Sequence, residues 1–204
     1  MDQPKVAIVD YEAGNLRSVQ KAIEFCGYIA NITTDLDEIN NCDGIILPGQ
    51  GASDSAISKL NEFGLSESIK NQINKGKPFL GICLGLQLLF ESSEEGDLLG
   101  LGLIEGRIEK FPEVSKVPHI GWNQVKFNQN HPINQGLPDE SNFYFAHSYF
   151  AATGSKYQLA TTDYGIQFCS AIAVDNLVAV QFHPEKSGSL GLRLYKNFLN
   201  MIIT

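Results

Sequence analysis

Cys83 is the side chain whose surroundings most clearly suggest covalent chemistry. It lies in residues 81–85 (GICLG), a G-x-C-x-G form of the nucleophile elbow. In such a turn the nucleophile ends a strand and begins a helix, so the flanking positions must be small. A helix N-terminus beside the sulfur favours the thiolate, which is the nucleophilic form. The alternative for the motif alone is a buried structural cysteine.

A thiol nucleophile needs a base, and the base needs a group that orients it. Among the four histidines, His183 is the best placed, because it follows an apolar segment, Leu177–Phe182, that predicts a strand. Pro184 favours an extended backbone at His183, and in an extended chain residues two apart share a side. We therefore expect His183 and Glu185 to face one site, as base and orienting carboxylate. A structural histidine at a strand end is the alternative.

Acyl transfer also needs donors for the developing oxyanion. Gly49 and Gly51 follow a predicted strand at Asp43–Leu47, and their backbone can approach a ligand closely. Their N–H groups and that of Leu84, directly after the nucleophile, are candidate donors. Gln87 lies one helical turn after the nucleophile and can reach a polar substrate from the same face. For Gly49 and Gly51 the alternative is a glycine-rich turn that binds no ligand.

The segments that must position these residues change in character along the chain. In the first half, apolar runs alternate with amphipathic segments, which predicts parallel βαβ units. Strands are predicted at Lys5–Asp10, Tyr28–Thr33, Asp43–Leu47 and Lys77–Ile82, and helices at Asn15–Cys26, Asp54–Phe63 (capped by Ser53), Ser66–Lys75 and Leu84–Glu91. The second half predicts strands at Leu103–Glu109, Val117–Phe127, Asn142–Phe150, Tyr157–Thr162, Gln167–Val174 and Leu177–Phe182, then a helix at Ser187–Ile203. The predicted fold is α/β, with a mixed, mainly parallel central sheet flanked by helices and an added antiparallel region.

Length and composition limit the class of protein. The chain has 204 residues, 43% of them hydrophobic, with a formal net charge of −8, so we expect one domain over residues 1–204. The acidic balance argues against nonspecific binding to nucleic acid or to an anionic membrane surface. The longest nearly apolar run, Phe79 to Phe90, is too short to span a bilayer, and the N-terminus lacks a signal-peptide pattern. The four cysteines show no CxxC spacing, so we predict a reducing, cytoplasmic location with no metal and no cofactor.

Together these motifs resemble the class I glutamine amidotransferases. Residues 81–87 (GICLGLQ) and 183–185 (HPE) look like the nucleophile and His-x-Glu motifs of that family. Four longer segments are similar to the glutaminase subunits of imidazole glycerol phosphate synthases: 83–91 (CLGLQLLFE), 117–123 (VPHIGWN), 144–150 (YFAHSYF) and 181–187 (QFHPEKS). The resemblance runs from Asp10 to the final helix, and it implies the class I glutamine amidotransferase fold.

The resemblance also implies a reaction and a partner. Cys83 would attack the carboxamide of glutamine, His183 would shuttle the proton, and Glu185 would hold His183. The released ammonia would pass to a (β/α)₈ cyclase subunit in a heterodimer, which forms imidazole glycerol phosphate and aminoimidazole carboxamide ribotide in histidine biosynthesis. The positions expected to bind glutamine are Gln87, Glu95, His147, Ser148 and Tyr149, and those expected at the subunit interface are Asn15, Trp122, Asn123 and Lys186.

One loop departs from the family pattern, and other functions stay open. The family's loop reads Pro-Gly-Val-Gly, with an aromatic residue two positions later. In this chain Gln50 replaces the valine and Ser53 replaces the aromatic residue. Backbone donors tolerate such changes, so we expect the chemistry to survive, while the response to the partner is open. The alternatives are a glutaminase subunit for amination of nucleotide-linked sugars, another type of cysteine hydrolase, or a non-catalytic regulatory subunit. His119 is expected to pack or to line the interface.

Overall fold

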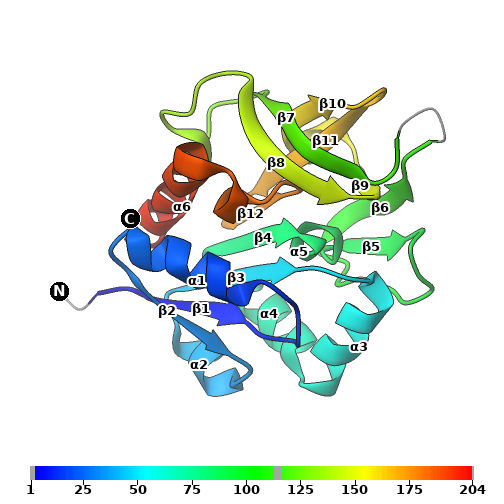
Figure 1. The fold of residues 1–204 in the computed structure, drawn as a ribbon. Coiled ribbons are helices and arrows are strands. Elements are labelled where there is room, and N and C mark those ends of the chain that lie inside the picture. Colours follow the sequence, from blue (N-terminus) through cyan, green and yellow to red (C-terminus); the bar gives the residue numbers. More distant parts are fainter. Residues whose placement is uncertain (1–2, 113–115, 204) are drawn as a thin grey trace.

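The structure, a computed structural model, describes residues 3–112 and 116–203 and is organised around one mixed sheet with helices on both faces (Figure 1). The main row of strands runs β2 (Ile29–Thr33), β1 (Lys5–Val9), β3 (Gly44–Gly49), β4 (Phe79–Cys83), β12 (Leu177–Val180), β11 (Gln167–Val174), β10 (Gln158–Asp163), β7 (His119–Phe127) and β8 (Ser141–His147). Three strands branch from it: β5 (Phe90–Ser93) pairs with β6 (Ile104–Lys110), which pairs with β9 (Tyr149–Ala152), which pairs with β11.

Pairing directions divide the sheet into two parts. The strands from β2 to β12 are parallel to their neighbours. From β12 onward the row is antiparallel, as are the pairs of β9 with β6 and β11. This arrangement confirms the predicted α/β class, with a parallel centre and an antiparallel extension.

The alternation of side chains in β1 shows how the sheet builds two cores. Val6 and Ile8 pack in one apolar cluster with residues of α1 (Leu16–Phe25) and α6 (Gly188–Ile203). Ala7 and Val9 point to the other face, where the cluster includes residues from three further helices. These are α2 (Leu36–Asn41), α3 (Ser53–Glu62) and α4 (Leu65–Asn74). Figure 1 shows α1 and α6 on the side of the sheet opposite α2 and α4.

Two segments around the predicted site differ from expectation. The helix expected at Leu84–Glu91 ends early: α5 covers only Leu84–Gln87, and the chain continues into β5. A short apolar run does not distinguish helix from strand, and here pairing with β6 decides. The strand expected at Asn142–Phe150 is split at Ser148, because β8 pairs with β7 whereas β9 pairs with β6 and β11.

Helix starts account for two further differences. Ser53 is not the N-cap of α3, because Ala52 is, and the buried Ser53 hydroxyl has no hydrogen-bond partner. The sequence analysis missed α2, which begins where Asp35 accepts hydrogen bonds from the Asp37 and Glu38 backbone N–H groups. Short 3₁₀ turns are η1 (Pro132–Asn134), η2 (Ser155–Tyr157) and η3 (Pro184–Lys186). Over residues 3–112 and 116–203, no helix combines the length and apolar character needed to cross a bilayer.

Candidate active site

Cys83 occupies the turn between β4 and α5, as the elbow motif predicts. Its backbone angles are φ 54° and ψ −108°, a conformation that residues other than glycine rarely adopt. This conformation holds the thiol at the end of the strand. A side chain at Gly85 would collide with the Leu47 carbonyl oxygen of the neighbouring strand. The second glycine of the motif is therefore required by the close approach of α5 to β3.

His183 reaches Cys83 because their strands are neighbours. β4 and β12 run parallel, with Val180 in register with Ile82, so the segments that follow both strands emerge at the same edge of the sheet. Glu185 then places its Oε1 2.8 Å from His183 Nδ1, and the two side chains are only 2% and 3% exposed. The predicted contact is present, but its predicted geometry is wrong: the backbone is extended only at His183, and the 3₁₀ turn η3 returns the carboxylate to the imidazole.

The charge state of His183 follows from these contacts. Burial alone opposes its positive charge, but hydrogen bonding and coulombic attraction to Cys83 and Glu185 outweigh burial and raise the pKa of His183 to about 9. The raised pKa favours protonated His183 near neutral pH, and a cationic imidazole stabilises a thiolate beside it. The core thiol of Cys169 offers a contrast, because burial raises its pKa to about 12.

Asn15 contacts Glu185 directly. Its Nδ2 donates to Glu185 Oε1 at 3.0 Å from the start of α1, where Asn15 adopts a left-handed backbone with φ 68°. The sequence analysis placed Asn15 at a subunit interface and gave no sign of this contact. The interface role stays a prediction, while the observed contact makes Asn15 a second donor to the carboxylate.

The residues expected to bind glutamine surround one cavity of about 390 Å³. Its lining contains Cys83, Leu84, Gln87, Glu95, His147, Ser148, Tyr149, His183 and Gly51, together with Gln50, Pro118, Ile120, Ala146 and Lys186. Gly49 lies behind this lining, at the end of β3 and in register with Cys83. The cavity size suits a small ligand, and the thiol faces it from the elbow.

Several of these side chains are already engaged with other protein groups. Gln87 Nε2 donates to the Tyr149 carbonyl at 3.1 Å and to Gln181 Oε1 at 3.0 Å, and Gln181 Nε2 lies 3.6 Å from Cys83 Sγ. Glu95 Oε2 accepts from the Ser53 backbone N–H at 2.9 Å. The sequence analysis missed Gln181, although it stands two residues before His183 and alternation along the extended segment that follows β12 could have revealed it.

A second histidine pair lies beside the cavity. His147 Nδ1 is 2.7 Å from the Tyr149 carbonyl oxygen, so it carries the proton and donates. His147 Nε2 must then accept, at 3.0 Å, from His119 Nδ1, and His119 Nε2 accepts from Asn123 Nδ2 at 3.3 Å. Burial is the main cause that lowers the pKa of His119 to about 4 and that of His147 to about 3, so both imidazoles are neutral.

The predicted interface residues are spread over the surface near the cavity mouth. Trp122 is 59% exposed, and its ring lies 6.1 Å from that of Tyr144. Lys186 Nζ lies 5.7 Å from the centre of the same Tyr144 ring. Ile120, which is 63% exposed, adds to this patch, whereas Asn123 is partly buried and also donates to the Asp163 carbonyl.

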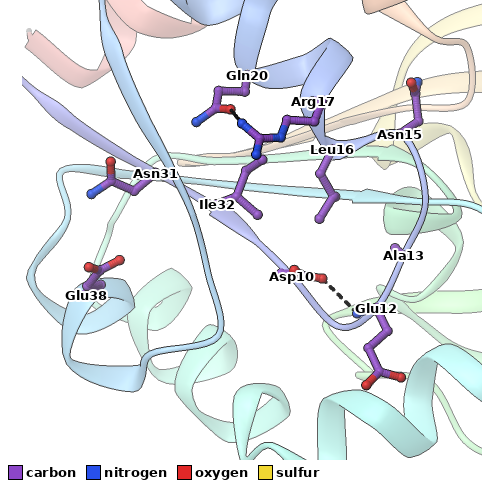
Figure 2. Close-up of a pocket in the computed structure, with 10 residues that line it drawn as sticks. All are labelled: Asp10, Glu12, Ala13, Asn15, Leu16, Arg17, Gln20, Asn31, Ile32 and Glu38. Carbon is purple, nitrogen blue, oxygen red and sulfur yellow. Dashed lines mark hydrogen bonds between the residues drawn. The ribbon is translucent and has the colours of Figure 1, made fainter.

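A separate hollow of about 780 Å³ lies at the carboxyl end of β1, beside the start of α1 (Figure 2). Its lining includes the acidic residues Asp10, Glu12 and Glu38 together with Arg17, whose guanidinium donates to Gln20 Oε1. No cysteine or histidine is among its described lining residues. Across the described parts of the chain, no three His, Cys, Asp or Glu side chains converge as a metal site requires. The Cys83 cavity, unlike this hollow, brings a thiol and an imidazole together.

Comparisons with known proteins identify the family of the chain. The family model described as glutamine amidotransferase class-I matches residues 7–202. The chain is 46% identical over 200 residues to the imidazole glycerol phosphate synthase subunit HisH of Dehalococcoides mccartyi (strain CBDB1), covering 97% of this chain and 98% of the relative. It is also 46% identical over 198 residues to the corresponding subunit of Methanocaldococcus jannaschii, covering 97% and 100%.

Solved structures support the fold. A putative GMP synthase protein from Thermoplasma acidophilum aligns with a TM-score of 0.75 at 22% identity, covering 100% of this chain and 96% of that one. A structure described as a glutamine amidotransferase aligns with a TM-score of 0.77 at 19% identity, covering 97% and 99%. The chain therefore belongs to the class I glutamine amidotransferase family and, within it, to the HisH subunits of imidazole glycerol phosphate synthase.

Proposed function

We propose that this chain hydrolyses glutamine to glutamate and ammonia, with Cys83, His183 and Glu185 as its catalytic triad. The observation that carries the proposal is the convergence of an elbow thiol, a buried imidazole and a buried carboxylate 2.8 Å from that imidazole. The raised pKa of His183, about 9, supports an imidazolium that stabilises the Cys83 thiolate before substrate binds.

The reaction divides into two halves. The Cys83 thiolate attacks the carboxamide carbon of glutamine, the C–N bond breaks, and His183 gives its proton to the leaving nitrogen, so ammonia departs and a glutamyl thioester remains. Water then attacks the thioester, His183 takes a proton from that water, and the C–S bond breaks to return the thiolate. Glu185 orients His183 throughout. The backbone N–H groups of Gly49, Gly51 and Leu84 are our candidates for stabilising the oxyanion.

We further propose that the ammonia is passed to a (β/α)₈ cyclase subunit in the cytoplasm, which uses it to form imidazole glycerol phosphate and aminoimidazole carboxamide ribotide. Support comes from the names of the relatives and from the exposed aromatic patch at the cavity mouth, which includes Trp122 and Lys186. Aromatic side chains and long cations are typical anchors of protein interfaces. Asn15 and Asn123 complete the predicted contact set.

The test is to isolate the full chain with the protein that it binds and to measure glutamate release. We expect a (β/α)₈ cyclase to be recovered, to stimulate glutaminase activity, and to be lost when Trp122 is changed to alanine. Recovery of a sugar-aminating enzyme would overturn the histidine pathway and leave the triad chemistry standing. Failure of a glutamine-analogue electrophile to label Cys83 in the complex would overturn the glutaminase proposal in favour of a regulatory subunit.

A further inference from the structure

One oxygen of the Glu185 carboxylate receives no hydrogen bond from the other triad residues. Glu185 Oε1 receives two donors, His183 Nδ1 at 2.8 Å and Asn15 Nδ2 at 3.0 Å. Glu185 Oε2 is buried and has no hydrogen-bond partner. A buried carboxylate oxygen without a donor is costly, so a donor near Oε2 would matter both for the charge and for the orientation of this group.

Tyr195 of α6 is buried next to Glu185 and carries the complementary unpartnered group. The ring is fully buried, and the hydroxyl, like Glu185 Oε2, has no partner in the structure. Gly191 explains how α6 approaches η3 so closely, since a side chain there would collide with the Pro184 carbonyl. Tyr195 lies one turn after Gly191, on the face of α6 that Gly191 turns toward η3, and it is close enough to Glu185 for the two side chains to interact.

The hydroxyl of Tyr195 keeps its proton near neutral pH and is therefore available as a donor. Burial first, and then the negative charge of Glu185, raises the pKa of Tyr195 well above its ordinary value. The phenol therefore keeps its proton beside the Glu185 side chain. The Tyr195 hydroxyl is an unpartnered donor and Glu185 Oε2 is an unpartnered acceptor, and both are buried on elements that pack together.

We propose that Tyr195 is a positioning residue of the glutaminase site, with its hydroxyl donating to Glu185 Oε2 directly or across one water molecule. Asn15 then holds one oxygen of the carboxylate and Tyr195 the other, so that Oε1 stays directed at His183. The inference rests on the proposed function, because it assigns Tyr195 a role through Glu185 rather than through the substrate. Tyr195 does not line the Cys83 cavity.

Tyr195→Phe tests the proposal, since it removes the hydroxyl and keeps the ring that fills the core. In the full chain with its cyclase partner, we expect kcat for glutamine hydrolysis to fall about 10-fold, the size of effect typical for a hydrogen bond to a charged group. KM should change by less than about 2-fold. Tyr28→Phe is the matched control, because Tyr28 packs against the same apolar cluster from the far end of α1, and we expect it to leave kcat unchanged.

A double-mutant cycle separates positioning from a merely structural role. In a Glu185→Ala background, removal of the Tyr195 hydroxyl should cost less than about 2-fold, because the group through which it acts is gone. The same loss in both backgrounds, or a wild-type kcat in a folded Tyr195→Phe protein, would overturn the role of Tyr195. Absence of glutaminase activity in the unmodified complex would instead overturn the proposed function.

Discussion

Two buried histidine environments in this molecule reach opposite charge states. His183 has a carboxylate at 2.8 Å and a thiol beside it, and its pKa is raised to about 9. His119 and His147 have each other, a backbone carbonyl and an amide as partners, and their pKa values are lowered to about 4 and about 3. Burial disfavours the charged imidazole in both places, so the ionisable partners of His183 make the difference.

The comparison explains how two kinds of histidine coexist around one cavity. A cation at His147 would repel the His183 imidazolium, whereas a neutral His147 can donate to the Tyr149 carbonyl without that penalty. The imidazole next to the Cys83 thiol is therefore charged, whereas the imidazoles in the cavity wall are neutral and serve as hydrogen-bonding groups.

Removal of the Cys83 thiol should have the largest effect on both activity and the charge of His183. Cys83→Ala should lower partner-stimulated glutamine hydrolysis by about 10⁴-fold or more, because the covalent intermediate is lost. It should also lower the pKa of His183 below about 9, since the thiol helps to raise it. Glutamate release and NMR titration of the imidazole measure the two effects, with Cys169→Ala as the control for a buried thiol outside the cavity. Full activity of Cys83→Ala would refute the triad.

Removal of the carboxylate charge should make His183 resemble His147. Glu185→Gln keeps the shape of the side chain but withdraws the attraction that supports the imidazolium, so the pKa of His183 should fall well below about 9. We expect kcat to drop by about 10² to 10⁴-fold, as when the orienting acid of a triad is lost. NMR titration and the pH dependence of kcat check this. An unchanged His183 pKa would show that Glu185 does not set the charge.

Stability should depend on pH with opposite signs at the two sites. The His183 contribution is fully present below the unfolded pKa of about 6.5 and is lost as pH rises toward about 9. The His119 and His147 contributions are present above about 6.5 and are lost as pH falls toward about 4, because the unfolded chain then binds protons that the folded chain excludes.

Urea unfolding across this pH range measures both effects. His119→Phe should reduce the slope of unfolding free energy between pH 4 and 6.5 by up to about 1.4 kcal/mol per pH unit, the amount for one proton. Phenylalanine suits the site, since the His119 ring stacks between Phe145 and Tyr164. An acid slope identical to that of the unmodified chain would contradict the assignment of a neutral His119.

The smallest expected effect sits at the outer end of the histidine pair. Asn123→Ala removes the donor to His119 Nε2, which should cost about 1 kcal/mol of unfolding free energy and raise the pKa of His119 above about 4. Asn142→Ala is the control, because Asn142 is exposed on the adjacent strand β8, in register with Gln124 rather than with Asn123. A His119 titration that is the same in both variants would remove Asn123 from the network.

Local patterns predicted the parallel strands, the elbow at Cys83 and the His183–Glu185 contact, because each depends on residues close together in the chain. The His119–His147 pair could not be predicted in this way. It depends on the register of β7 against β8, which places the two residues opposite each other, and the long connection between these strands leaves that register open. The same holds for Asn15 and Glu185, which are 170 positions apart and meet only through the packing of α1 against η3.

The pairing of β4 with β12 also has a consequence for the synthesis of the chain. The ribosome completes the nucleophile strand early, but the strand that delivers His183 comes near the end, after the whole antiparallel extension. Until β12 enters its place beside β4, the nascent polypeptide carries a thiol without a base. We expect unfinished chains to have no glutaminase activity, so that hydrolysis begins only after β12 and α6 have been synthesised.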